Sequence, residues 1–288
     1  MVAVPLIVRK EVTGDLAFWE HQPRSFSETE TDFANQLGST ISLAVDNAHL
    51  YLEQQRIAIT LQDNFIHPPP EVAGLELGLI SQAAFAPGLV GGDFSDVFLL
   101  DESHVVVLIG DVAGKGVRAA GHTETVRSTV RALAAIDSSP AFVLGKTNGL
   151  LLRFEPDEQL VTAFLAVLDL HSGSLTYASA GHPAPVHLGA AGCQALDETV
   201  GLPLGSFEHD YANAHVMLSP EDYLVLYTDG VTEARRDGEL FGEDRLLEAV
   251  CGLRGRSAQG VAEDVSSAAL AFAGQLSDDL QVVVLRLA

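Results

Sequence analysis

Two aspartates, Asp93 and Asp111, each follow a glycine beside an apolar run in the segment GGDFSDVFLLDESHVVVLIGDVAGKG at residues 91–116. The apolar runs, at residues 97–100 and 105–109, are separated by a short polar turn, which is typical of paired strands. Such a hairpin can bring both carboxylates into one small volume, where they repel each other unless a cation lies between them. Oxygen ligands of this kind suit Mg²⁺ or Mn²⁺. Taken alone, the segment fits a plain hairpin with acidic turns equally well.

Two more aspartates have the same placement. Asp229 follows the apolar run at residues 224–227, and Asp278 lies shortly before the apolar run at residues 282–285. If these strand edges meet on one side of a pair of stacked sheets, four carboxylates converge there. Aspartates at strand edges are also common as plain turn formers, and this is the alternative for each of them taken singly.

Composition limits the classes of function. The chain has 288 residues, which is enough for one large domain or for one domain with an extension. Its net charge of −23 repels phosphate backbones and anionic lipid surfaces, so we expect neither nucleic acid nor membrane as a partner. The two cysteines, Cys193 and Cys251, have no spacing that indicates a pair. We therefore expect no disulfide and no zinc site, and the simple inference is a reducing, cytoplasmic compartment.

The order of apolar runs and turns predicts the elements that must position the aspartates. At the front, a Thr13-Gly14 turn joins two predicted strands, and the proline-free residues 28–65 predict a long helix with Ser27 or Thr29 as its cap. Later, many strands joined by tight turns, with helices inserted in pairs, favour an antiparallel α+β architecture over a doubly wound parallel sheet. The predicted strands are residues 2–8, 15–19, 75–85, 97–100, 105–109, 161–170, 174–179, 185–188, 212–218, 223–228 and 280–287, and the further predicted helices are residues 116–136, 140–154, 243–253 and 258–272.

Six segments, taken in order, resemble the PPM-type metal-dependent protein phosphatases, and within them the SpoIIE/RsbU-like branch. The resemblance covers about residues 62–288 and implies an antiparallel β-sandwich flanked by helices, with two Mn²⁺ or Mg²⁺ ions at one edge of the sandwich. The segments are VGGDFSDVF at 90–98, IGDVAGKGVRAA at 109–120, SAGHPAPVHL at 179–188, GLPLG at 201–205, LYTDGVTEAR at 226–235 and SDDLQVVVLR at 277–286.

The resemblance also implies a role for each acidic position. Asp111 would bridge both ions, and the carbonyl of Val112 would join the ligand shell. Asp93 would hold one ion, while Asp229 and Asp278 would hold the other. The expected metal set is Asp93, Asp111, Val112, Asp229, Asp278 and, as a weaker candidate, Asp279, and the expected catalytic set is Asp93, Asp111, Asp229 and Asp278.

Three other polar residues near these motifs have simpler interpretations. Asp96 lies three residues after Asp93, so on a regular strand it faces the opposite way, and we leave it out of the metal set. Lys115 and His182 could contact the phosphate or the leaving group. A solvated turn lysine and a hydrogen-bonded turn histidine are the interpretations that we favour, and the general acid stays unidentified.

The function implied by the resemblance is that of a serine/threonine protein phosphatase. Two ions about 3.5–4 Å apart can share a water, lower its pKa and offset charge on the phosphoryl oxygens, so that no covalent phospho-enzyme is needed. By resemblance, the substrate would be a phosphorylated partner protein of the STAS type, an anti-anti-sigma factor. The alternative is a non-catalytic regulatory scaffold that keeps the phosphatase fold.

The front of the chain is similar to the last third of a GAF sensor domain. We expect a GAF-like remnant at residues 1–36, a connector helix at 37–66 and the phosphatase domain at 67–288. The remnant lacks the strands that would form a ligand pocket, so no small-molecule site is expected there. Along the helix, Leu50, Ile57 and Leu61 keep heptad spacing, which fits either packing on its own domain or the seam of a homodimer.

Overall fold

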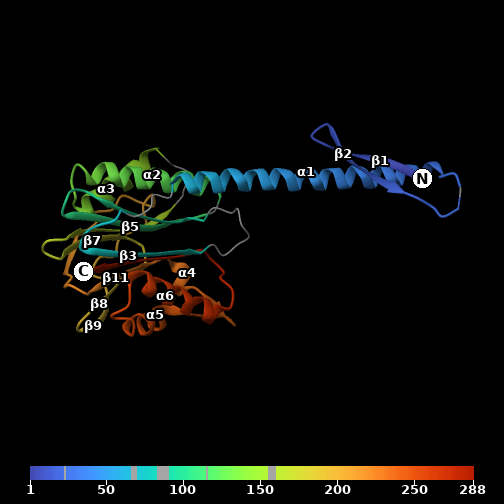
Figure 1. The fold of residues 1–288 in the computed structure, drawn as a ribbon. Coiled ribbons are helices and arrows are strands. Elements are labelled where there is room, and N and C mark those ends of the chain that lie inside the picture. Colours follow the sequence, from blue (N-terminus) through green and yellow to red (C-terminus); the bar gives the residue numbers. More distant parts are fainter. Residues whose placement is uncertain (23, 66–69, 83–90, 115, 155–159) are drawn as a thin grey trace. The chain divides into compact units, whose positions relative to one another are not determined.

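The computed structural model describes the chain apart from residues 23, 66–69, 83–90, 115 and 155–159, and leaves the side chains of residues 54–65 and 117 undescribed (Figure 1). The chain divides into two compact units, residues 1–60 and 61–288. Among the helices in the described ranges, none is both long enough and apolar enough to cross a bilayer.

The first unit is a hairpin followed by a helix. Strands β1 (Val2–Val8) and β2 (Glu11–Phe18) pair antiparallel, and α1 (Glu28–Phe65) begins where the sequence predicts. Its start is a capping box: the Glu30 N–H donates to the Ser27 hydroxyl at 3.3 Å, and the Ser27 N–H donates to the Glu30 carboxylate at 2.8 Å. The predicted helix and the predicted Ser27 cap are therefore confirmed.

The turn of this hairpin is not where the sequence predicts it. The chain reverses at Arg9 and Lys10, which both have positive φ, at 50° and 69°, as in the two-residue turns that match strand twist. Gly14 lies inside β2 opposite Leu6, next to an irregularity in the register. The prediction of a Thr13-Gly14 turn was wrong because this glycine serves a bulge within the strand.

The hairpin packs on one side of α1. Gly38 allows the close approach, since a Cβ there would lie 2.6 Å from Val4 Cγ1, and the Ile7 N–H donates to the Ser42 hydroxyl at 3.0 Å. The hairpin does not cover Leu43 and Leu50, which are 62% and 48% exposed. The first half of the helix therefore packs on its own hairpin and still leaves large apolar side chains in solvent, while the predicted stripe residues Ile57 and Leu61 have side chains outside the described set.

A surface hollow of about 470 Å³ lies at the Phe18 end of this hairpin. Its lining includes Phe18, Trp19, Phe26 and Phe33, together with Arg24, whose guanidinium is paired with Glu20 and Glu30. The expectation that the first unit has no small-molecule site stays a prediction.

The second unit is built on two stacked five-stranded sheets (Figure 1). The strand orders are β10-β7-β6-β5-β4 and β3-β14-β11-β8-β9, and all neighbours in them pair antiparallel. A separate two-stranded ribbon joins β12 to β13. The strands are β3 (Leu75–Gln82), β4 (Asp93–Leu99), β5 (His104–Val112), β6 (Val161–Asp169), β7 (Ser174–Ala180), β8 (Val186–Gly189), β9 (Gly192–Ala195), β10 (Ala214–Met217), β11 (Tyr223–Tyr227), β12 (Arg235–Arg236), β13 (Glu239–Leu240) and β14 (Leu280–Leu287).

Helices cover both outer faces of the stack, as Figure 1 shows. Helices α2 (Val117–Ala134) and α3 (Pro140–Phe154) pack on the first sheet, and α5 (Gly242–Cys251) and α6 (Ala258–Ala273) pack on the second. Alternate strand residues such as Ile109, Phe164 and Leu226 fill the layer between the sheets. The predicted antiparallel sandwich flanked by helices is confirmed. The short helix α4 (Asp229–Thr232) and strands β9, β12 and β13 were not predicted.

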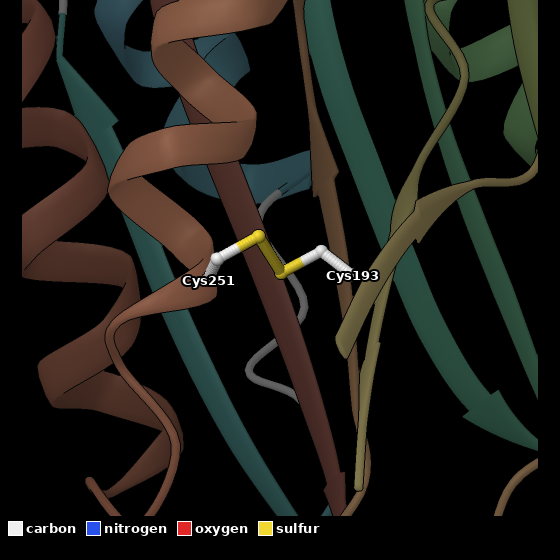
Figure 2. The surroundings of a disulfide bond; sticks show 2 residues. All are labelled: Cys193 and Cys251. Carbon is white, nitrogen blue, oxygen red and sulfur yellow. A yellow bond between two sulfur atoms is a disulfide. The ribbon is translucent and has the colours of Figure 1, made fainter. Parts of the chain in front are cut away.

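Cys193 and Cys251 form a disulfide between β9 and the end of α5, with their Cα atoms 5.6 Å apart (Figure 2). The prediction of unpaired cysteines was wrong. The two residues are 58 positions apart, so local spacing carried no sign of the pair, whereas the fold packs α5 against the edge strand β9. The inference of a reducing compartment loses its basis with this bond.

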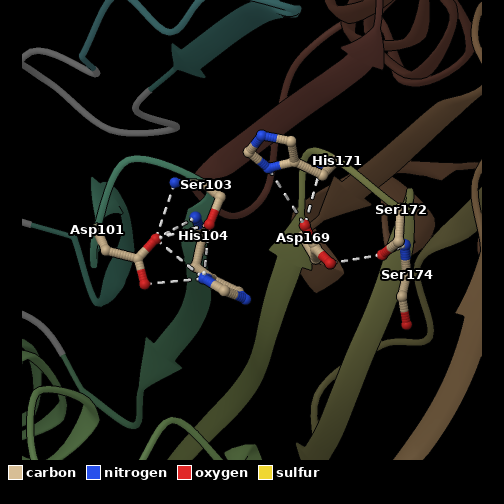
Figure 3. A network of polar contacts seen from close by, with 7 residues as sticks. All are labelled: Asp101, Ser103, His104, Asp169, His171, Ser172 and Ser174. Carbon is tan, nitrogen blue, oxygen red and sulfur yellow. Dashed lines mark hydrogen bonds and ion pairs between the residues drawn. The ribbon is translucent and has the colours of Figure 1, made fainter.

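Polar turns close the two hairpins of the first sheet (Figure 3). The Asp101 carboxylate accepts the N–H groups of Ser103 and His104 at 2.8 Å each, and Asp169 accepts the Ser172 hydroxyl at 2.6 Å. The Leu170 N–H donates to the Ser103 carbonyl at 2.8 Å and joins the two turns. Because the strands are antiparallel, these turns fix one end of the sheet and leave Asp93 and Asp111 at the other end.

Candidate metal centre

The β4–β5 register places Asp93 directly opposite Asp111. Asp93 is the first residue of β4, and Asp111 is the residue before the last in β5, so both lie at one edge of the first sheet. Asp229 begins α4, which a single residue, Thr228, separates from β11 of the second sheet. One carboxylate oxygen from each of the three lies within 4.8 Å of the others. The fold therefore brings three of the predicted aspartates together from two sheets.

The remaining predicted acids lie at the same edge. Strands β11 and β14 are antiparallel, with Tyr227 opposite Val282, so the end of β11 meets the start of β14. Asp278 and Asp279 precede β14 and are close enough to raise the pKa of Asp111 by repulsion. Asp279 is buried, and its N–H donates to Asp278 Oδ1 at 2.8 Å. Neither belongs to the set of three oxygens within 4.8 Å.

Two glycines let the backbone pass against these carboxylates. A Cβ on Gly92 would lie 2.2 Å from the Val112 carbonyl oxygen and 2.3 Å from Asp111 Oδ1. A Cβ on Gly91 would lie 2.2 Å from Asp279 Oδ2. At Gly92 the neighbour is rigid backbone, so a side chain there would displace it, whereas at Gly91 the neighbour is the side chain of Asp279. The Val112 carbonyl therefore lies beside the Asp111 carboxylate.

The crowding of acids has an electrostatic consequence. Burial raises the pKa of Asp93 far above its usual range, and repulsion from Asp111, Asp229 and Asp279 adds to the shift. Burial also raises the pKa of Asp111, with repulsion from Asp229 and Asp278 as further causes. A divalent cation would relieve both effects, and an all-oxygen donor set suits a hard cation. The residues present therefore fit Mn²⁺ or Mg²⁺.

Thr228 is a site residue that sequence reasoning missed. Its side chain is fully buried, and its hydroxyl donates to Asp93 Oδ2 at 2.7 Å. The only sign in the sequence is its position directly before Asp229. The partner lies 135 residues away, so the contact follows from sheet packing and not from any local pattern.

Asp96 faces away from the carboxylate cluster, as predicted from strand alternation. Its side chain is 1% exposed and pairs with Arg131, whose Nε and Nη2 lie 2.6 and 2.7 Å from the two carboxylate oxygens. Arg127 Nη2 lies 3.7 Å from the same carboxylate. The Arg131 guanidinium also stacks over the Phe98 ring at 4.5 Å. Asp96 therefore joins β4 to α2, a structural role that the sequence did not indicate.

His182 lies beneath the acidic edge. Its Nδ1 is 2.9 Å from the hydroxyl of Thr162, which is opposite Asp111 in the β5–β6 register. Burial lowers the pKa of His182 to about 3, so the ring is neutral at pH 7. This geometry agrees with a hydrogen-bonded turn histidine. Lys115 lies outside the described residues.

The fold of the second unit is that of solved PP2C-type domains. A crystal structure of the RsbU and RsbW domains of a Mycobacterium tuberculosis protein superposes with a TM-score of 0.68 at 24% identity, over 75% of this chain and 61% of that chain. The PP2C phosphatase domain of SpoIIE from Bacillus subtilis, with a fragment of its regulatory domain, gives 0.66 at 22% identity, over 75% and 64%. At these identities the likeness establishes the fold alone.

The sequence gives the family. The model for stage II sporulation protein E (SpoIIE) matches residues 101–288, and the chain belongs to this family. The phosphoserine phosphatase RsbU of Bacillus subtilis is 29% identical over 220 residues, which cover 75% of this chain and 64% of RsbU. Protein IcfG of Synechocystis is 29% identical over 249 residues, which cover 75% of this chain and 38% of IcfG. The chain thus spans less than two thirds of the lengths of these relatives. The predicted membership is confirmed, and the GAF-like assignment of the front stays a prediction.

Proposed function

We propose that this chain is a metal-dependent serine/threonine protein phosphatase that hydrolyses phosphoserine or phosphothreonine on a regulatory partner protein. The observation that carries the proposal is the convergence of Asp93, Asp111 and Asp229 at one edge of a PP2C-type sandwich. Similarity to a phosphoserine phosphatase, RsbU, supports the class of substrate.

Each acidic residue has a proposed role in holding two Mn²⁺ or Mg²⁺ ions. Asp111, with the Val112 carbonyl alongside, would serve both ions, Asp93 would serve one of them, and Asp229 and Asp278 would serve the other, with Asp279 as the weaker further ligand. When bound, the ions supply a water of lowered pKa as nucleophile and offset the charge on the phosphoryl oxygens.

The chain's own residues fit a mechanism without a covalent intermediate. Both of its cysteines, Cys193 and Cys251, are joined to each other and so offer no thiolate nucleophile. Gly91 and Gly92 let their backbone lie close to the carboxylates. The neutral His182 is hydrogen-bonded to Thr162, which is opposite Asp111 in the β5–β6 register. These groups position the site and leave the attack on phosphorus to water.

The proposed partner is a phosphorylated STAS-type anti-anti-sigma factor, and this rests on the family resemblance. We also propose that a second copy of the chain binds through α1 to form a homodimer. Leu43 and Leu50 are seven residues apart, are 62% and 48% exposed, and continue in heptad spacing to Ile57. A second copy of the same helix would cover these side chains.

One experiment tests the activity against the scaffold alternative. The metal-free protein is incubated with a phosphoserine peptide, p-nitrophenyl phosphate and a phosphorylated STAS protein, with and without Mn²⁺. We expect release of phosphate that needs Mn²⁺ and stops with EDTA. Metal-loaded protein that turns over none of the three substrates would favour the scaffold.

A further inference from the structure

Thr228 connects the aspartate of one sheet with the strands of the other. Its hydroxyl donates to Asp93 Oδ2 at 2.7 Å and accepts the N–H of Gln281 at 2.9 Å. Because a backbone N–H can only donate, the single hydroxyl proton is left for the carboxylate. The directions of both hydrogen bonds are therefore fixed by the backbone of β14.

The hydroxyl of Thr228 is not used to cap a helix. Thr228 occupies the N-cap position of α4, where a threonine side chain ordinarily accepts an N–H of the first turn, yet it makes no such bond. The turn is closed by backbone instead, since the Val231 N–H donates to the Thr228 carbonyl at 3.1 Å. The Thr228 hydroxyl instead donates to Asp93, the first residue of β4 in the facing sheet.

The segments that carry the other aspartates are fixed to each other at the same place. The Thr228 N–H donates to the Gln281 carbonyl at 3.0 Å, which extends the β11–β14 ladder by one residue. A Cβ on Gly230 would lie 1.8 Å from the Asp279 carbonyl oxygen, so the start of α4 rests directly on the approach to β14. The hydroxyl of Thr228 joins these paired segments of the second sheet to Asp93 of the first sheet by a hydrogen bond.

We infer that Thr228 is a positioning residue of the metal centre. Its hydroxyl occupies Asp93 Oδ2 and leaves Oδ1 for a cation, and it fixes Asp93 relative to Asp229 and Asp278. The inference rests on the proposed metal centre but not on the proposed substrate. Partners that orient a ligating carboxylate in this way affect metal affinity as well as rate.

Two substitutions separate the hydroxyl from the shape of the side chain. T228V keeps the branched shape and removes the hydroxyl, while T228S keeps the hydroxyl. The control is T147V, because Thr147 is equally buried and its hydroxyl donates to the Val143 carbonyl within α3 at 2.8 Å. Mn²⁺ is titrated calorimetrically into each metal-free protein, and the circular dichroism spectrum checks the fold.

We expect T228V to bind Mn²⁺ about 10- to 100-fold more weakly, which is the usual effect of losing a group that orients a ligand. T228S and T147V should bind as the unmodified protein does. If T228V does not fold, T228A and T228S are compared in the same titration, and T228A should show the loss. Equal affinity in the variants with and without the hydroxyl would overturn the inference.

The titration also keeps this inference distinct from the proposed function. No substrate is present, so a protein that binds Mn²⁺ but hydrolyses no phosphoprotein would refute the function and leave the role of Thr228 decided by affinity. Normal turnover together with unchanged Mn²⁺ affinity in T228V would refute only the role of Thr228. An unmodified protein that binds neither Mn²⁺ nor Mg²⁺ would overturn both.

Discussion

Five acidic side chains at one edge of the sandwich make the metal-free site electrostatically unfavourable at neutral pH. Asp93 and Asp111 are opposite each other in the register, and Asp229 approaches them from the second sheet. Burial disfavours the charged forms of Asp93 and Asp111, and repulsion from the neighbouring carboxylates adds to this, so the pKa values of both are raised. A change that removes one charge therefore affects metal binding and metal-free stability in opposite directions.

The first prediction concerns these charges singly. D111N and D229N keep the size of the side chain and remove a proposed ligand charge, so each should lower turnover by more than about 100-fold, beyond the usual effect of losing an orienting partner. In EDTA, thermal unfolding should show a Tm equal to or above that of the unmodified protein, because repulsion is relieved. Near-normal Mn²⁺-dependent turnover in either variant would remove that aspartate from the proposed shell.

His182, again a single residue, makes a pH-dependent contribution to the free energy of unfolding. Its folded pKa is lowered to about 3 by burial, below the value near 6.5 of the unfolded chain. The unfolded state therefore binds more protons between these values, and the contribution to stability is lost as pH falls below about 6.5. At pH 5 the loss is roughly 2 kcal/mol, from about 1.4 kcal/mol per pKa unit.

The second prediction follows from that sign. In H182N the amide can still bond the Thr162 hydroxyl but does not titrate. Urea unfolding at pH 7 and pH 5, both in EDTA, should show a smaller decrease in the free energy of unfolding for H182N than for the unmodified protein. An identical decrease would mean that another group is responsible for the acid sensitivity.

At the scale of elements, the pair between Asp96 and Arg131 fastens β4 to α2. The third prediction is that D96N lowers the free energy of unfolding by about 1–3 kcal/mol, less than for a fully buried pair because Arg131 is 38% exposed. Turnover should fall far less than in D111N. The variant R131M should be destabilised similarly, and D96N/R131M should be no worse than either alone. Additive losses would show that the two residues do not act as a pair.

Apolar runs were sufficient to predict most elements, because a strand whose two faces are both buried has a nearly continuous apolar sequence. Strand β14, helix α3 and the span of α1 follow from such runs and from proline placement. The edge strand β9 was missed because GCQA has no apolar pattern of its own. The turn at Arg9 and Lys10 was missed because neither residue is typical of positive φ.

The candidate site was only partly predictable. Placement at strand ends indicates that aspartates converge, and the structure brings Asp93, Asp111 and Asp229 within 4.8 Å. The contact that supports Asp93, from Thr228, crosses between the sheets over 135 residues, and the pair that anchors β4 to α2, Asp96 with Arg131, spans 35 residues. Such pairs depend on how layers stack, and a single sequence carries no local signal for them.

At the scale of the whole molecule, the disulfide closes a long loop through the second sheet and α5. The fourth prediction is that C193S/C251S, or dithiothreitol on the unmodified protein, lowers the free energy of unfolding by up to about 4 kcal/mol, the chain-entropy value for residues 58 apart. Dithiothreitol should have no further effect on the double variant. Two titratable thiols in the untreated, denatured protein would show that the bond does not form.

The last prediction concerns the proposed dimer. Leu43 and Leu50 are seven residues apart on α1, and the β1–β2 hairpin leaves their large apolar side chains exposed. Changing Leu50, Ile57 and Leu61 to glutamine should weaken association, because each loses apolar surface from the seam and gains a polar group that the partner must desolvate. Leu52 is 58% exposed but is two residues out of the heptad spacing, so L52Q is the matched control and should leave the dimer intact. Light scattering at high micromolar concentration measures the mass of all three proteins. A monomer in the unmodified protein, or equal weakening by L52Q, would refute a seam at these positions.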